Sequence, residues 1–135
     1  MRYFKFSKLV RDKIVDHMRS NNQELYGLHK LDDKTFEREL LRKLVEESEE
    51  ASSADGQKEV LKELADVQEI IDTLKSLLKI SDEELSIAKK KKIEKNGSFD
   101  NRCYVEGIGV EEDSKWLEFY LKNPEKYPEV EKPIE

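Results

Sequence analysis

Acidic residues occupy positions of two predicted helices where apolar residues would be expected to pack. Residues 43–71, KLVEESEEASSADGQKEVLKELADVQEII, contain two helical patterns on either side of the short turn sequence SSADG. Gly56 in this turn suits the left-handed conformation that ends a helix. The stretch therefore predicts an antiparallel helical hairpin, and this hairpin constrains the fold of the chain more than any other feature.

The predicted hairpin places two acidic pairs opposite each other. Glu47 and Glu50 lie three residues apart before the turn. Glu63 and Asp66 lie three residues apart after it. Glu50 and Glu63 are equally far from the middle of the turn, and the same holds for the outer two acids. In an antiparallel hairpin the two pairs would therefore face each other at the same height.

Helical angles put these acids on or beside the apolar sides of the two helices. On the first helix, with an advance of about 100° per residue, Glu47 falls inside the apolar arc and Glu50 at its rim. Glu49 points toward solvent. The second helix has a main apolar stripe of Val60, Leu64, Val67, Ile71, Leu74 and Leu78. Its acids, Glu63 and Asp66, fall on a neighbouring arc that they share with Ile70 and Leu77.

Four carboxylates that converge on an apolar seam need compensation, because burying one unpaired carboxylate costs several kcal/mol. Either a divalent cation or nearby Lys and Arg residues can supply it. Mg²⁺ or Mn²⁺ suits a site of carboxylates alone, without Cys or His nearby. A hairpin with a solvated acidic edge is the alternative interpretation at this point.

The overall composition agrees with a helical protein. The chain has 135 residues, of which 41% are charged and 36% hydrophobic, and this balance favours long amphipathic helices. A net charge of −6 with both signs mixed argues against binding of duplex nucleic acid. The single Cys103 and the lack of a long apolar run predict a soluble, cytoplasmic protein without a membrane segment.

We expect an all-α helical bundle built on the acidic hairpin. Asp32 or Asp33 is predicted to cap the first hairpin helix, and Ser81 with Glu84 forms a capping box for a later one. The residues near 99–110 are predicted to be irregular or extended. The expected helices cover residues 7–19, 34–53, 57–79, 81–95 and 114–123. The expected domains are 1–110 and a C-terminal helix and tail, 111–135, that docks on the body or on a second subunit.

Two basic segments flank the hairpin. Lys8, Arg11 and Lys13 belong to the sequence KLVRDKI, and residues 89–92 are four consecutive lysines. A solvated basic surface is the simplest interpretation of each segment, since a run of four winds around a helix and at most two of its members point in one direction.

Several motifs, in the same order, resemble those of the MazG-like all-α nucleotide pyrophosphohydrolases. The acidic pattern is Glu46-Glu47-x-x-Glu50, twelve intervening residues, then Glu63-x-x-Asp66. KLVRDKI at 8–14 resembles the N-terminal signature of the small phosphoribosyl-ATP-pyrophosphohydrolase-like branch, and KKIEKNGSF at 91–99 resembles its KKxxERGGF segment. Together these motifs cover most of residues 8–105. Asn96 stands where the family motif often has Arg.

The resemblance implies Mg²⁺-dependent hydrolysis of a nucleoside triphosphate, which can be a non-standard one, to the monophosphate and pyrophosphate by a homodimer or higher oligomer. Mn²⁺ is the alternative ion. Carried over to this chain, it implies that Glu47, Glu50, Glu63 and Asp66 bind the metal. Glu46 would help to orient the attacking water, so the catalytic set is Glu46, Glu47 and Glu50. The groups expected to meet the phosphates are Lys91, Lys92, Asn96, Arg11 and Lys13.

Two alternatives stay open on the sequence. One is phosphoribosyl-ATP hydrolysis in histidine synthesis, which uses the same class of chemistry. The other is a non-enzymatic helical interaction module whose acidic edge binds a basic partner. Neither the preferred base nor the preferred sugar follows from the sequence.

Overall fold

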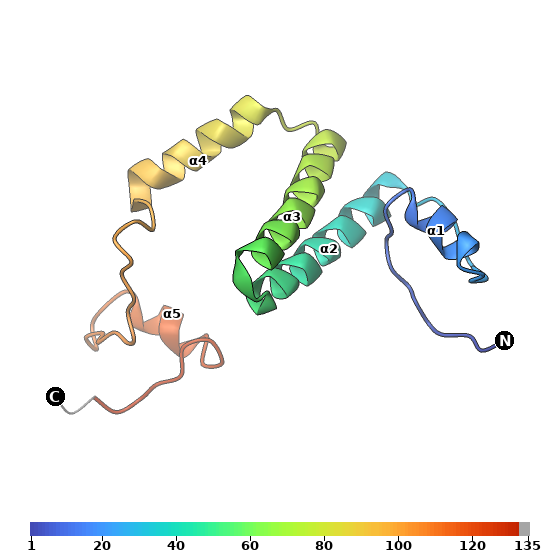
Figure 1. Cartoon of the computed structure of the whole chain (residues 1–135). Coiled ribbons are helices and arrows are strands. Elements are labelled where there is room, and N and C mark those ends of the chain that lie inside the picture. The colour runs from blue at the N-terminus through green and yellow to red at the C-terminus, as the bar shows by residue number, and fades with distance from the viewer. Residues whose placement is uncertain (133–135) are drawn as a thin grey trace. The chain divides into compact units, whose positions relative to one another are not determined.

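A computed structural model describes residues 1–132 of the chain. These residues form helices and irregular segments without a strand, which confirms the predicted all-α class. None of the helices within them is both long and apolar enough to cross a membrane. The helices are α1 (Ile14–Ser20), α2 (Asp33–Ser53), α3 (Gly56–Leu78), α4 (Asp82–Asn96) and α5 (Leu117–Leu121) (Figure 1).

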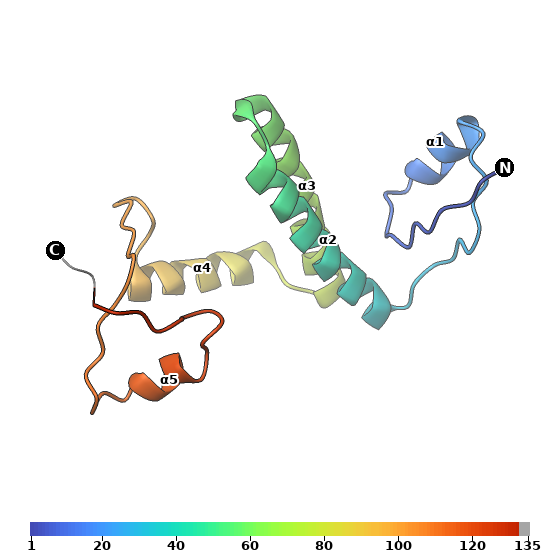
Figure 2. The same cartoon turned by 90° about the horizontal axis from the view of Figure 1, so that it is seen from below.

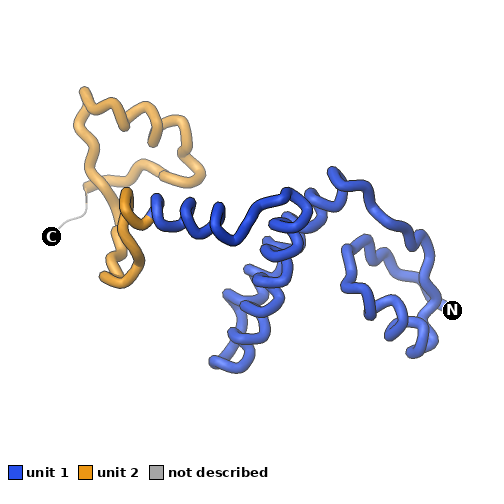
Figure 3. The backbone as a smooth tube through the Cα atoms, turned by 90° about the horizontal axis from the view of Figure 1, so that it is seen from above, with its two compact units in different colours: residues 1–92 blue, residues 93–135 orange. Residues whose placement is uncertain are grey.

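The chain divides into two compact units, one of residues 1–92 and one that begins at Ile93 (Figure 3). The division falls inside α4, before the residue at which we placed the domain boundary. The domains expected from the sequence, 1–110 and 111–135, stay a prediction. The first unit contains the acidic hairpin and is the part that positions the candidate site.

Helix α2 begins where its sequence supplies a capping side chain. The carboxylate of Asp32 accepts a hydrogen bond of 2.8 Å from the backbone N–H of Thr35, while Asp32 itself keeps an extended conformation. This is N-capping, in which a side chain satisfies a donor left free at the first turn. The same hydrogen bond lowers the pKa of Asp32. Of the two capping residues that the sequence offered, Asp32 is the one used.

The turn between α2 and α3 is short and depends on one glycine. Helix α2 ends at Ser53, and its C-cap Ala54 has an extended conformation, so a left-handed residue does not end this helix. Gly56 has a φ of +81° but is the first residue of α3. The expectation that Gly56 ends the first helix is therefore wrong, although the left-handed conformation inferred for it is present. Glycine adopts this conformation without the steric cost that a side chain would add.

Helices α2 and α3 pack against each other and run antiparallel, as the two views in Figures 1 and 2 both show. Within residues 1–132, the buried hydrophobic side chains are Leu40 on α2 and Ile70 on α3. Ile70 comes from the arc that it shares with Glu63 and Asp66, whereas Leu64 of the expected main stripe is 54% exposed. Helix α3 thus packs on α2 with the side that carries its acids.

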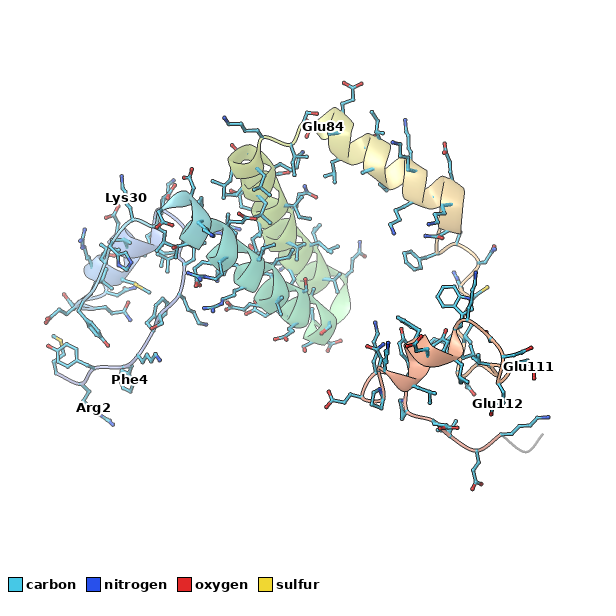
Figure 4. The ribbon with its side chains drawn as sticks, turned by 180° about the vertical axis from the view of Figure 1, so that it is seen from behind. Arg2, Phe4, Lys30, Glu84, Glu111 and Glu112 are labelled. Atoms are coloured by element: carbon cyan, nitrogen blue, oxygen red, sulfur yellow. The ribbon has the colours of Figure 1, made fainter. Side chains whose placement is uncertain are left out.

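The hairpin leaves apolar surface uncovered on both of its helices. On α2, Leu41 is exposed and Val45 is 58% exposed. On α3, Leu61 is 66% exposed and stands beside the exposed Leu64. Figure 4 shows side chains that project from α2 and α3 away from the seam between them. Each of these helices therefore has an apolar side besides the one that forms the seam.

Helix α1 is shorter than the sequence predicted. We expected a helix from Ser7 to about Arg19, but α1 begins at Ile14 and residues 8–11 are not helical. Ser7 has a φ of +46°, which is far from the extended conformation of an N-cap residue. The residues after it instead reach the hairpin through ion pairs of Lys8 and Arg11. These long-range contacts replace the local hydrogen bonds of the expected helix.

Helix α4 begins with the expected capping box. The Ser81 hydroxyl accepts from the backbone N–H of Glu84, and the Glu84 carboxylate accepts from the backbone N–H of Ser81. Figure 4 labels Glu84 at the start of this helix. The first turn is acidic, whereas Lys95 lies in the last turn, an arrangement that complements the helix dipole. All residues of α4 are exposed.

The unit that begins at Ile93 contains α5 and a group of packed aromatic rings. Residues 103–110 are irregular, the first of the two conformations expected near 99–110. The last helix spans Leu117–Leu121, shorter than the expected 114–123. The Ser114 hydroxyl accepts a hydrogen bond from the N–H of Trp116, just before this helix. The rings in mutual edge or tilted contact are Trp116, Phe119, Tyr120 and Tyr127.

Candidate metal centre

Three carboxylates from the two hairpin helices meet at the seam. Glu47 and Glu50 come from α2, and Glu63 comes from α3. One oxygen atom of each carboxylate lies within 4.8 Å of the others. Glu47 and Glu63 lie on the packing sides of their helices, and Glu50 is exposed at the edge of the seam. The antiparallel arrangement brings the three together in space. We call these three residues the acidic cluster.

The acidic cluster contains buried oxygen atoms that lack hydrogen bonds. Glu47 is only 9% exposed. Within the described residues, Oε2 of Glu47 and Oε2 of Glu63 are buried and have no hydrogen-bond partner. Buried polar atoms in proteins are nearly always satisfied, and an unsatisfied carboxylate is expensive to bury. Two such atoms on facing helices therefore need either a bound proton or a positively charged group between them.

The electrostatic environment of the cluster disfavours three negative charges. Burial raises the pKa of Glu47, and the neighbouring Glu50 raises it further. The same two causes, in the same order, raise the pKa of Glu63. Asp66 adds a smaller contribution of the same sign to both groups. A cation at the cluster would reverse this effect, since it favours the ionised form of each carboxylate.

Glu46, the residue before Glu47 on α2, is already paired with two lysines. Glu46 accepts a hydrogen bond of 3.2 Å from Nζ of Lys8, and Nζ of Lys43 lies 3.6 Å from its other oxygen. The hydrogen bond from Lys8 is the main cause of a lowered pKa for Glu46. Nζ of Lys43 also lies 3.6 Å from Oε1 of Glu47. Glu46 is therefore an ionised, paired carboxylate beside the cluster.

Asp66, the fourth metal ligand expected from the sequence, is paired with an arginine. Nη2 of Arg11 donates a hydrogen bond of 2.7 Å to Oδ1 of Asp66. The three carboxylates whose oxygens converge do not include Asp66. Its role as a ligand stays a prediction, and its present partner is a side chain of the N-terminal segment.

Sequence reasoning missed two cations of this region. Lys43 lies three and four residues before Glu46 and Glu47, the spacing at which side chains on one helix form ion pairs, so the sequence did contain a signal for it. Lys8 belongs to the KLVRDKI motif, but only the fold brings it to Glu46. Arg11 of the same motif was expected near the site, and its pair with Asp66 places it there.

The other expected phosphate contacts are exposed side chains. Lys91 and Lys92 are exposed on α4, and for residues 1–92 the structure shows no ion pair between them and the hairpin. Lys13 is exposed and without an ion pair in the described part of the chain. Asn96 is the exposed last residue of α4 and belongs to the unit that begins at Ile93. The roles of these four residues stay predictions.

The dimensions of the acidic cluster fit a hard divalent cation. Mg²⁺ and Ca²⁺ bind carboxylate oxygens at about 2.0–2.6 Å, so two ligands on opposite sides of an ion are separated by about 4–5 Å. The oxygens of Glu47, Glu50 and Glu63 lie within 4.8 Å of one another. The absence of Cys and His from this group excludes the usual ligand set of structural zinc. The cluster thus fits the class of ion expected from the sequence.

Comparison of the chain with protein-family models, with curated proteins and with solved structures finds no match. The likeness to the MazG-like proteins therefore rests on the sequence motifs described above.

Proposed function

We propose that the protein is a Mg²⁺-dependent nucleotide pyrophosphohydrolase that releases pyrophosphate from a nucleoside triphosphate. The observation that carries this proposal is the pair of buried, unpartnered oxygens on Glu47 and Glu63. A solvated acidic edge would leave such atoms in contact with water. The segments KLVRDKI and KKIEKNGSF, which resemble motifs of the MazG-like pyrophosphohydrolases, lie outside the acidic cluster and indicate that the substrate is a nucleotide.

Glu47, Glu50 and Glu63 would hold the ion, with Asp66 as the fourth ligand. Bound there, Mg²⁺ supplies charge neutralisation for the phosphate oxygens and raises the acidity of water. Glu46 is suited to accept a hydrogen bond from the attacking water, because its lowered pKa keeps it ionised. No side-chain nucleophile is needed for this chemistry, since water can attack the phosphorus directly.

Cations beside the cluster would bind the phosphate groups. Lys43 contacts both Glu46 and Glu47, and Lys8 contacts Glu46, so both are within reach of a chain of phosphates held at the cluster. Arg11 adds a guanidinium group, which can bind two phosphate oxygens at once. Lys13, Lys91, Lys92 and Asn96 remain proposed phosphate contacts on the strength of the motifs.

The proposal includes a homodimer or higher homo-oligomer. Within residues 1–132 the buried hydrophobic side chains are only Leu40 and Ile70, and the hairpin helices keep exposed apolar sides that a second copy can cover. A second copy packed on the exposed apolar sides of α2 and α3 would bury Val45, Leu61 and Leu64. Sedimentation is expected to show a dimer or larger species, and a strict monomer that hydrolyses nucleotides would contradict this part of the proposal.

We also place the protein in the cytoplasm. Cys103 is a free, exposed thiol, and it is the single cysteine of the sequence. Free thiols persist in a reducing compartment, and nucleotide substrates are abundant there. Localisation of the tagged full chain by fractionation tests this assignment.

The decisive experiment is an assay of pyrophosphate release with a panel of nucleoside triphosphates, standard and non-standard, and with phosphoribosyl-ATP. Activity is expected with Mg²⁺ or Mn²⁺ and should disappear with a chelator. Preference for phosphoribosyl-ATP would assign the alternative enzymatic function. No release from any substrate, together with unchanged thermal stability in millimolar Mg²⁺ and Mn²⁺, would contradict the proposal, since a bound ion stabilises the native state by about 2.7 kcal/mol at a concentration of 100 Kd.

A further inference from the structure

Arg11 and Asp66 form the shortest contact between the N-terminal segment and the acidic region of the hairpin. The distance from Nη2 to Oδ1 is 2.7 Å, and the side chains are 60% and 31% exposed. A charge-assisted hydrogen bond of this length is stronger than one between neutral groups. Its solvent exposure nevertheless keeps its net contribution to stability small. The pair is therefore well formed and easily exchanged.

Asp66 lies next to the acidic cluster without belonging to it. It follows Glu63 by three residues, so the two side chains are neighbours on the surface of α3. Its charge acts on both Glu47 and Glu63. A cation held by the cluster would attract Asp66, and Arg11 competes with that cation for the same carboxylate.

We propose that Arg11 withholds Asp66 from the metal in the resting protein and releases it when a substrate phosphate takes over the guanidinium group. This inference rests on the proposed function. In the resting state the ion would have three carboxylate ligands. Binding of the substrate phosphate to Arg11 would free Asp66 to become the fourth ligand. Arg11 is then a positioning residue, which acts on the metal through Asp66.

The placement of Arg11 suits such an exchange. Its backbone carbonyl accepts a hydrogen bond of 3.0 Å from the N–H of Ile14 at the start of α1, whereas its side chain is 60% exposed and can change partners. Lys8 anchors the N-terminal segment to the hairpin through Glu46, which keeps Arg11 near the cluster when it leaves Asp66. A guanidinium group forms paired hydrogen bonds with phosphate as readily as with a carboxylate.

The substrate phosphate and the metal ion would both act on the pairing of Arg11 with Asp66. Each of them must therefore change the affinity of the other by the same factor. If phosphate draws Arg11 away from Asp66 and so strengthens metal binding, then removal of Arg11 should strengthen metal binding without any substrate. A merely structural ion pair predicts the opposite, since its loss would loosen the segment and leave the metal affinity unchanged or lower.

The test is a titration of the protein with Mn²⁺ alone, in which isothermal calorimetry measures the dissociation constant. Arg11→Gln is expected to bind Mn²⁺ about fivefold more tightly than the unsubstituted chain, the lower end of ordinary coupling between two sites. Arg19→Gln is the matched control, because it removes the same guanidinium charge from an exposed side chain of α1 that forms no ion pair within residues 1–132. Its Mn²⁺ affinity should change by less than about twofold, since exposed charges are screened.

A double substitution separates the release of Asp66 from a general charge effect. Asp66→Asn alone is expected to leave the resting Mn²⁺ affinity almost unchanged, because Arg11 already holds this carboxylate. In the Arg11→Gln, Asp66→Asn double variant the gain should vanish, a non-additivity that reports direct coupling between the two residues. Arg11→Lys keeps a charge at this position and should bind Mn²⁺ like the unsubstituted protein.

Two results would overturn the inference by itself. One is Mn²⁺ binding that Arg11→Gln leaves unchanged or weakens. The other is a gain in affinity that persists in the double variant. Failure of the unsubstituted chain to bind Mn²⁺ at all would instead overturn the proposed function, and this inference with it.

Discussion

The α2–α3 hairpin and helix α4 are both rich in charged residues, but they place these residues differently. In the hairpin, Glu47 is buried and three carboxylates converge within 4.8 Å. On α4, every residue is exposed, and acids in the first turn and Lys95 in the last follow the helix dipole. A high density of charge alone therefore does not create a site. A second helix, packed on the charged side, is what turns acidic residues into a candidate metal centre.

Substitution of Glu63 in the hairpin should lower activity far more than substitution of an acid on α4, and this is the largest effect that we expect. Glu63→Gln keeps the shape of the side chain and removes one ligand charge. Loss of partners outside the ligand shell typically costs 10–100-fold in metal affinity or activity, so loss of a ligand should lower kcat/KM by about 100-fold or more. The pyrophosphate assay measures this effect.

Glu83→Gln in the first turn of α4 is the control for this substitution and should retain full activity. Circular dichroism should show an unchanged helical content for both variants. Full activity of Glu63→Gln would contradict the assignment of the acidic cluster as the metal centre.

Two leucine substitutions test whether the hairpin is more tightly packed than α4. Leu40→Ala should destabilise the protein by about 2–3 kcal/mol, because it removes one of the two buried hydrophobic side chains among residues 1–132. Leu85→Ala removes the same atoms from the exposed surface of α4 and should change the stability by less than about 0.5 kcal/mol. Urea unfolding of both variants measures the difference. Equal losses of stability would show that α4 packs as tightly as the hairpin does.

The two regions should also differ in how their acids respond to pH. The pKa values of Glu47 and Glu63 are raised above the ordinary 4.5, so the metal-free native state binds more protons than the unfolded state does. Their contribution to stability is complete below pH 4.5 and is lost as the pH rises through the raised values. Asp82 at the start of α4 makes stability depend on pH in the opposite direction, because its hydrogen bond with Lys75 lowers its pKa. Its contribution is present above the ordinary 3.8 and is lost as the pH falls through the lowered value.

Urea unfolding at a series of pH values, in the presence of a chelator, measures this dependence. Glu63→Gln should shrink the loss of stability above pH 4.5, because one of the two responsible groups no longer titrates. Saturating Mg²⁺ should reverse the sign, since metal binding requires deprotonated ligands. A metal-free protein that gains stability steadily above pH 4.5 would contradict the electrostatic account of the cluster.

The smallest expected effect concerns the lysines of α4. Lys91→Gln combined with Lys92→Gln should raise KM by about two- to fivefold and leave kcat unchanged, because exposed, screened charges contribute at most about 1 kcal/mol. Lys89→Gln with Lys90→Gln is the matched control from the same run. If both double variants have the KM of the unsubstituted protein, Lys91 and Lys92 do not contact the phosphates.

Local sequence signals predicted the starts of α2 and α4 and the bounds of the hairpin helices. Asp32 caps α2, and Ser81 with Glu84 forms the capping box of α4. Helices α2 and α3 span Asp33–Ser53 and Gly56–Leu78, within one residue of the expected bounds. Caps and helix periodicity depend on residues a few positions apart, so a single sequence contains the information that they need.

Contacts between distant segments were not predictable in the same way. The sequence showed two apolar arcs on α3 without deciding which of them packs on α2, and the structure buries Ile70 from the arc with the acids. Both arcs obey the same helical period, and only the partner helix decides between them. Likewise, the pairs of Lys8 with Glu46 and Arg11 with Asp66 join residues 38 and 55 positions apart, and these pairs accompany the late start of α1.

The sequence by itself determined that the chain is helical and where its long helices begin and end. These properties follow from period and capping, which act within a few residues. Only the tertiary structure decided that Glu47, Glu50 and Glu63 converge while Arg11 occupies Asp66. The physical reason is that a carboxylate binds whichever positive charge the fold brings nearest, and that choice depends on distances between segments far apart in the chain.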